Sequence, residues 1–149
     1  MQSILNIKLK METQAKQEFS SARAALDEEE ERLGRLYDRK SGYEREAELL
    51  LSGTLNLRAI GENRAAVRCM ERYISEQKVR ITIAERNLEQ ARLRLTEVMK
   101  ERKTHETLKE KAFQQFLADE KRQEGKEVDE LTSYTYGQRR KDELSSALA

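Results

Sequence analysis

Apolar residues recur along the first third of the chain in alternating steps of four and three residues. Nine of the eleven positions in this series, which runs from Ala15 to Leu50, are apolar or aromatic. A seven-residue repeat of this kind is typical of a helix that packs against another helix in a coiled coil. The positions are Ala15, Phe19, Ala22, Leu26, Glu29, Leu33, Leu36, Lys40, Tyr43, Ala47 and Leu50.

A second series with the same period follows an interruption, LSGTLNLRAIG, at residues 51–61. Gly53 and Gly61 can adopt backbone angles that end a helix and allow a turn. The sequence therefore predicts two helices joined by a loop. The second series comprises Val67, Met70, Ile74, Gln77, Ile81, Ala84, Leu88, Ala91, Leu95 and Val98.

The two helices are expected to run antiparallel, so that the numbers of facing residues have a constant sum. A sum of 117 pairs the two series throughout and sets large residues against small ones, such as Leu33 against Ala84. The same register places Phe116 opposite Met1, as the last residue of the second helix with a facing partner. The remaining residues, Leu117 to Ala149, then form an overhang.

We predict an all-α fold: a long antiparallel two-helix coiled-coil hairpin with a C-terminal helical overhang. All 149 residues form one domain, with a first helix at about 3–51, a tip loop at about 52–61 and a second helix at about 62–133. Residues 134–149 contain β-branched residues, a glycine and serines, and they are expected to fray.

Composition supports elongated helices rather than a compact globule. Charged residues make up 38% of the chain, apolar residues only 37%, and proline is absent. The net charge of +1 gives no overall field that favours nucleic acid or an anionic membrane. The amino terminus lacks the apolar region of a signal peptide, and the lone cysteine fits a reducing compartment, so we expect a cytosolic protein.

Catalytic chemistry is not expected. Gly125-Lys126 is followed by a glutamate and does not belong to a phosphate-binding loop. One histidine and one cysteine provide neither a metal site nor a convincing nucleophile and base pair. We therefore predict no enzyme activity, no metal and no cofactor.

Several single residues allow both a structural and a functional interpretation. His105 fits a register layer opposite Glu12 better than a pH switch, as Lys40 fits one opposite Gln77. Cys69 is interpreted as a bystander rather than a redox group. Two sets remain open: a basic stripe that is either a solvated face or a docking patch for an acidic partner, and loop residues that either cap the hairpin or bind protein. The stripe is Arg64, Arg68 and Arg72, and the loop residues are Leu55, Leu57 and Ile60.

The block LKEKAFQQFLADEKRQEGKEVDE, residues 108–130, resembles the carboxy-terminal signature of the bacterial flagellar export protein family FliJ. Gly125 stands where that family usually has glutamine, and Val128 where leucine is common. The first helix and the RYI stretch at residues 72–74 are also similar. The matching residues of the block are Leu108, Lys109, Glu110, Phe116, Glu120, Arg122, Glu124, Lys126, Asp129 and Glu130.

The resemblance implies a non-enzymatic central stalk of the flagellar type III protein export apparatus, a system of flagellum biogenesis, motility and chemotaxis. Its partners would be the hexameric export ATPase, the cytoplasmic domain of the export gate and substrate chaperones, at the inner face of the cell membrane. Contact with the gate is expected at Tyr73, Gln77 and Arg80. Contact with the ATPase ring is expected at Phe116, Glu120, Arg122, Glu124, Lys126, Asp129 and Glu130.

Three alternatives differ from this hypothesis. The nearest is the equivalent stalk of a virulence-type injection system. A second is a cytosolic coiled-coil scaffold without an ATPase partner. The third, nucleic-acid binding through the basic stripe, is disfavoured by the nearly neutral net charge.

Overall fold

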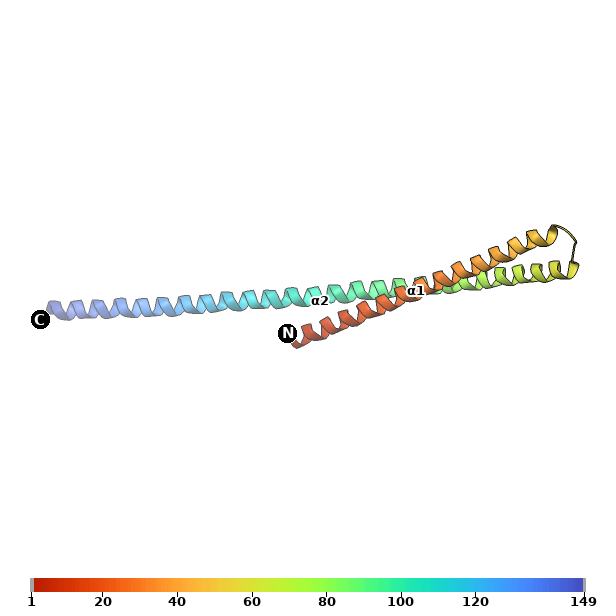
Figure 1. Ribbon diagram of the computed structural model, residues 1–149. Helices are drawn as coiled ribbons and strands as arrows, with labels where there is room; N and C mark the ends of the chain where they lie inside the picture. The colour runs from red at the N-terminus through yellow and green to blue at the C-terminus, as the bar shows by residue number, and fades with distance from the viewer. Residues whose placement is uncertain (1, 149) are drawn as a thin grey trace. The chain divides into compact units, whose positions relative to one another are not determined.

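Two long helices make up nearly all of the chain in a computed structural model, which describes residues 2–148. Helix α1 spans Gln2–Leu51 and helix α2 spans Leu57–Leu148 (Figure 1). The described residues contain no strand, and the two helices pack against each other, so the predicted all-α helical hairpin is confirmed. The contacts divide the described chain into two compact units, residues 6–102, and residues 2–5 together with 103–148. The single coiled-coil domain stays a prediction.

The tip loop is shorter than the sequence predicted. Gly53, with a φ of 105°, allows the turn, and the Leu49 carbonyl accepts hydrogen bonds from the Ser52 amide (3.3 Å) and hydroxyl (2.9 Å). The Asn56 side-chain oxygen accepts from the Ala59 amide at 3.2 Å, as an N-cap residue does. This cap starts α2 at Leu57, not at about residue 62 as predicted.

Burial follows the predicted seven-residue repeat on both helices of the unit 6–102. Ala15, Met70, Ile74 and Val98 are buried, and nearly all other apolar positions of the two series are half-buried. The repeat also extends into the stretch that was predicted to be loop, because Ile60 is half-buried, and it continues through the buried Asn63. The seam between the helices is therefore the core of this unit.

The register differs from the predicted one. In the unit 6–102, hydrogen bonds and ion pairs between the helices join residues whose numbers add up to between 106 and 114, centred near 110. A sum of 110 lies one heptad below the predicted 117 and sets Leu36 opposite Ile74 rather than Ile81. The error arose because a shift by seven residues again pairs seam with seam, so that only the loop length decides between the two registers.

Three buried polar side chains interrupt the apolar seam, and two of them, Glu12 and Gln77, have partners other than those predicted. The Asn63 amide donates to the Tyr43 carbonyl at 2.9 Å. The Gln77 amide donates to the Glu29 carbonyl at 2.9 Å, instead of facing Lys40. Buried Glu12 forms ion pairs with Arg102 and, at 3.5 Å, with Lys16. Each layer satisfies a polar group in one relative position of the helices, which favours a single register.

In the unit that contains residues 103–148, Leu5 is buried and His105 is half-buried. Lys109 donates a hydrogen bond to Gln2. From residue 106 to residue 148 every side chain is exposed, including Phe116, whose predicted facing partner, Met1, lies outside the described residues. Residues 106–148 are called the exposed segment below. Helix α2 continues to Leu148, past residue 133, where the sequence placed its end. The fraying of residues 134–149 stays a prediction.

Candidate functional site

The predicted ring-contact residues all lie on the surface of the exposed segment. Within residues 2–148, no ion pair within 4.0 Å holds Glu120, Arg122, Glu124 or Lys126. Phe116 is 56% exposed. These side chains contribute nothing to a seam, so they are free to meet another protein.

Charges of opposite sign lie on opposite sides of this part of α2. Glu120 and Glu124 are four residues apart, as are Arg122 and Lys126, so that each pair forms a short row along the helix. With 3.6 residues per turn, the two rows are separated by about half a turn. An acidic face and a basic face therefore run along the same stretch of helix.

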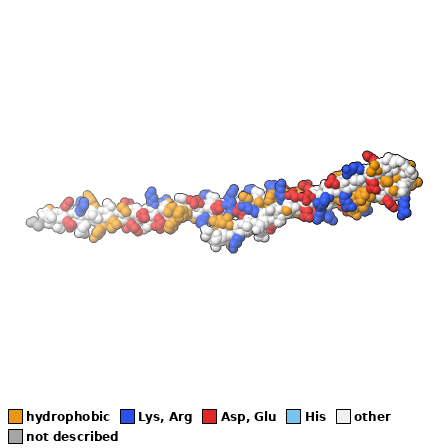
Figure 2. Space-filling model, viewed as in Figure 1, with side chains coloured by type: hydrophobic (Ala, Val, Ile, Leu, Met, Phe, Trp, Pro, Cys, Tyr) orange, Lys and Arg blue, Asp and Glu red, His pale blue; other side chains and the backbone are white. Residues whose placement is uncertain are grey.

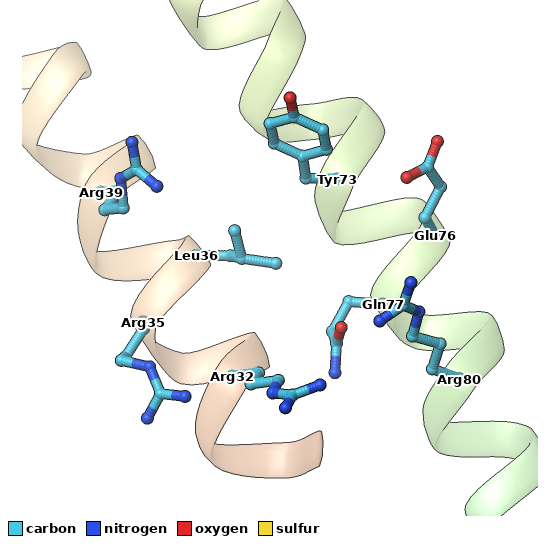
Figure 3. Close-up of a pocket in the computed structure, with 8 residues that line it drawn as sticks. All are labelled: Arg32, Arg35, Leu36, Arg39, Tyr73, Glu76, Gln77 and Arg80. Atoms are coloured by element: carbon cyan, nitrogen blue, oxygen red, sulfur yellow. The ribbon is translucent and has the colours of Figure 1, made fainter. Parts of the chain in front are cut away.

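The predicted gate-contact residues line a groove in the unit 6–102. The groove has a volume of about 430 Å³ and lies between α1 and α2 (Figure 3). Leu36 points from α1 towards α2, and Gln77 points from α2 towards α1. Tyr73 is 41% exposed, but Gln77 is only 6% exposed and its amide is bonded to Glu29. Of the three predicted residues, Tyr73 and Arg80 thus offer surface to a partner.

Sequence reasoning missed the other wall of this groove. Arg32, Arg35 and Arg39 of α1 line it opposite Tyr73, Glu76 and Arg80 of α2. The spacing of three and four residues between these arginines marks one helix face. The register decides which residues of α2 lie opposite that face, and the predicted register, wrong by one heptad, placed it beside a part of α2 about seven residues further along the chain.

Around the basic stripe, side chains contact one another along one surface of α2. The guanidinium of Arg72 lies 5.7 Å from the centre of the Tyr73 ring and donates a hydrogen bond to the Cys69 sulfur at 3.7 Å. Arg64 and Arg68 border a shallow hollow with Ala47 and Val67. Basic and acidic side chains are interspersed over much of the drawn face (Figure 2).

Leucines near the tip loop do not cap the hairpin. Leu55 is 58% exposed and Leu57 is 79% exposed, whereas Ile60 is half-buried in the seam. Leu49 and Leu51, at the end of α1, are also exposed. Of the two interpretations left open for the loop residues, capping therefore applies to Ile60 alone.

Neither a metal site nor a membrane-spanning helix is present among residues 2–148. The part of the chain that the structure describes holds no group of three or more His, Cys, Asp or Glu side chains placed to bind a metal ion. None of its helices combines the length and apolar character needed to cross a membrane.

Comparisons with known proteins agree with this architecture. The sequence model of the family described as "Flagellar FliJ protein" matches residues 1–141. No curated protein matches the chain. Among solved structures, that of CT670 from Chlamydia trachomatis, described as a YscO homolog, is similar with a TM-score of 0.61 and 22% identity, over 93% of this chain and 94% of that one. At this identity, the likeness shows a shared fold.

Proposed function

Because this chain belongs to the FliJ family of flagellar proteins, we propose that it is a non-enzymatic central stalk of the flagellar type III export ATPase complex. In this role it promotes assembly and activity of the hexameric ATPase ring and links the ring to the export gate and to substrate chaperones. It works in the cytoplasm, peripherally at the inner face of the cell membrane. The protein contributes binding surfaces, and the ATPase supplies the chemistry.

One observation carries the ATPase contact: the exposed segment, with its unpaired charges on opposite helix faces. A helix that enters a ring-shaped pore meets subunits on all sides, so it needs contact groups around its whole circumference. Glu120 and Glu124 provide one face, and Arg122 and Lys126 provide the other. Exposed charges of both signs direct association and orientation more than they add affinity.

The gate contact uses the groove in the hairpin. Tyr73 and Arg80 lie at its surface, and Gln77 lies at its floor. The ATPase contact and the gate contact therefore belong to different parts of α2, and this separation allows one chain to bind both partners at once.

The test of the ATPase contact replaces Glu120, Arg122, Glu124 and Lys126 with alanine. These side chains are exposed and alanine favours helix, so stability should change by less than about 1 kcal/mol. We expect the variant to lose stimulation of ring assembly and of ATP hydrolysis. The measurement is the ATPase rate against added stalk protein, with circular dichroism and melting recorded on the same samples.

A matched control removes the same charges from the hairpin. Replacement of four exposed residues of the hairpin with alanine should leave stimulation of the ATPase intact. These residues are Lys10, Glu85, Arg86 and Glu97. Full stimulation by the exposed-segment variant would contradict the ring contact. No stimulation by the unaltered protein would favour the scaffold without an ATPase partner.

A second candidate is the equivalent stalk of a virulence-type injection system, which the likeness to the YscO homolog favours. The same assay separates the two. We expect stimulation of the flagellar ATPase from the same genome, and stimulation of an injection-system ATPase alone would support the alternative.

A further inference from the structure

The groove between α1 and α2 carries more positive charge than its walls neutralise. Four arginines and one glutamate line it. Arg32 is paired with Glu28 at 3.0 Å and Glu29 at 3.3 Å, and Arg35 approaches Glu31 at 4.0 Å. Of the four arginines in the groove, Arg32 is therefore fully paired and Arg35 is loosely paired, and the other two differ from them.

Those two are Arg39 on α1 and Arg80 on α2. Among residues 2–148, neither forms an ion pair within 4.0 Å or a side-chain hydrogen bond, although Glu76 lies on the same wall as Arg80. The floor between them is formed by Leu36 and by Gln77 (Figure 3). A guanidinium at each wall of a partly apolar groove can bind carboxylates that belong to a single peptide segment lying in the groove.

We propose that this groove is the docking site for an acidic segment of a partner protein, with Arg39 and Arg80 as the two unpaired charge contacts, the loosely paired Arg35 as a third charge contact and Tyr73 as the aromatic contact. Arg35 and Arg39 are one helical turn apart. A partner helix with two carboxylates four residues apart matches that spacing. The proposal rests on the proposed gate contact for the identity of the partner, and on the groove itself for the chemistry.

Charge distribution favours a protein segment over a nucleic acid. The acidic run at residues 27–31 lies on α1 just before Arg32, and it repels a phosphate backbone that extends along the helix. A short acidic segment can end before this run. The groove also offers Tyr73 and Leu36, which contact the apolar residues of a peptide.

The first experiment measures fluorescence anisotropy of the full chain with a labelled alanine-rich helical peptide that carries glutamate pairs four residues apart. We expect weak binding that decreases with salt and is absent for the same peptide with glutamine instead of glutamate. The double variant Arg39→Gln and Arg80→Gln should bind about fivefold more weakly, as expected for the loss of two partly exposed ion pairs. Equal binding of both peptides would overturn the proposal.

A matched double variant controls for net charge. Arg64→Gln and Arg68→Gln removes the same charge from the basic stripe, outside the groove, and should change affinity by less than about twofold. Equal losses of affinity in the two double variants would mean that binding depends on the overall positive charge of the chain. That result would overturn the proposal that the peptide binds in the groove. Stronger binding of a labelled single-stranded oligonucleotide than of the acidic peptide, lost in the groove variant, would overturn the choice of a protein segment.

The cognate gate domain separates this proposal from the proposed function. If the cytoplasmic domain of the gate binds the unaltered chain and the groove variant equally well, the groove proposal is wrong and a gate contact elsewhere stands. If the acidic peptide binds in the groove and the gate domain does not bind, the gate assignment is wrong and the groove proposal stands. The groove variant and the matched double variant should both retain the helical circular dichroism of the unaltered chain.

Discussion

Residues 6–102 and the exposed segment, residues 106–148, are both helical, but different interactions stabilise them. In the hairpin, an apolar face of each helix is buried in the seam, and three buried polar layers are satisfied by specific partners. In the exposed segment no side chain is buried. Its helix is stabilised by backbone hydrogen bonds, by intrinsic propensity and by exposed side-chain hydrogen bonds such as that from Gln115 to Asp119 at 3.1 Å. Without a buried seam, such a helix is only marginally stable in water.

The difference separates two tasks along a single chain. A seam makes a hairpin rigid, but it occupies the apolar side chains that form it. The exposed segment keeps Phe113, Phe116 and Leu131 at the surface, each more than half exposed. Apolar and charged groups that no internal contact uses remain available to a partner, which can order the helix further on binding.

The first prediction concerns the register, which decides where the seam ends. In a Cys69→Ser background, Leu26→Cys with Ala84→Cys should form a disulfide within one chain, because a sum of 110 sets these positions face to face. Leu33→Cys with Ala84→Cys should not, since one heptad moves the residues about 10 Å apart along the axis. Non-reducing gel electrophoresis and peptide mapping detect both outcomes.

The opposite result would restore the sum of 117 and extend the seam beyond His105. Cross-links between chains rather than within one chain would indicate a parallel dimer instead of a hairpin. Either result would contradict the division of the chain into a seam-stabilised hairpin and a helix without a seam.

Hydrogen exchange should reveal the next largest difference. Amides of the hairpin open only when the seam separates, whereas amides of the exposed segment open by local fraying. We expect protection factors in residues 60–98 to exceed those in residues 110–148 by about 100-fold or more. Mass spectrometry of peptic peptides is the measurement. Equal protection in both regions would mean that the exposed segment has a partner, such as a second copy of the chain.

A matched pair of substitutions compares the two regions by stability. Val98→Asp places a charge at a position that is 5% exposed, and it should destabilise the hairpin by about 3 kcal/mol. Val128→Asp makes the same change on the same helix at a position that is 60% exposed, with an expected effect below about 0.5 kcal/mol. Thermal unfolding followed by circular dichroism gives both values. Similar losses would show that Val128 also packs in a core.

The seven-residue repeat was sufficient to predict the helices and their contact faces. Residues such as Ala15, Ile74 and Val98 were assigned to the seam by spacing, and they are buried. The repeat could not predict the register, because helices that slide by seven residues bury the same faces. That choice depended on Asn56, a helix cap inside a stretch interpreted as loop because it carried two glycines and few charges.

The candidate sites were predicted less completely than the fold. The signature residues of the exposed segment were found by resemblance, since periodicity says nothing about an unpaired surface. The groove needs residues from two helices, so its α1 wall, including Arg39, emerged only with the correct register. Gln77 followed the seam period and is buried, which fits its place in the repeat better than direct contact with a partner.

The smallest effect we predict comes from glycine replacements in the two regions. Gly34 on α1 and Gly125 on α2 both have open space where a Cβ atom would lie, so alanine fits without strain and gains about 1 kcal/mol of helix propensity. In the hairpin this gain adds to a cooperative unit, and Gly34→Ala should raise the melting temperature by about 4 °C. In the exposed segment the same gain is local. Gly125→Ala should therefore leave the melting temperature of the hairpin unchanged within about 1 °C and slow hydrogen exchange only in neighbouring residues. A comparable rise in melting temperature for both variants would show that the two regions unfold together, against the division into a seam-stabilised hairpin and a helix without a seam.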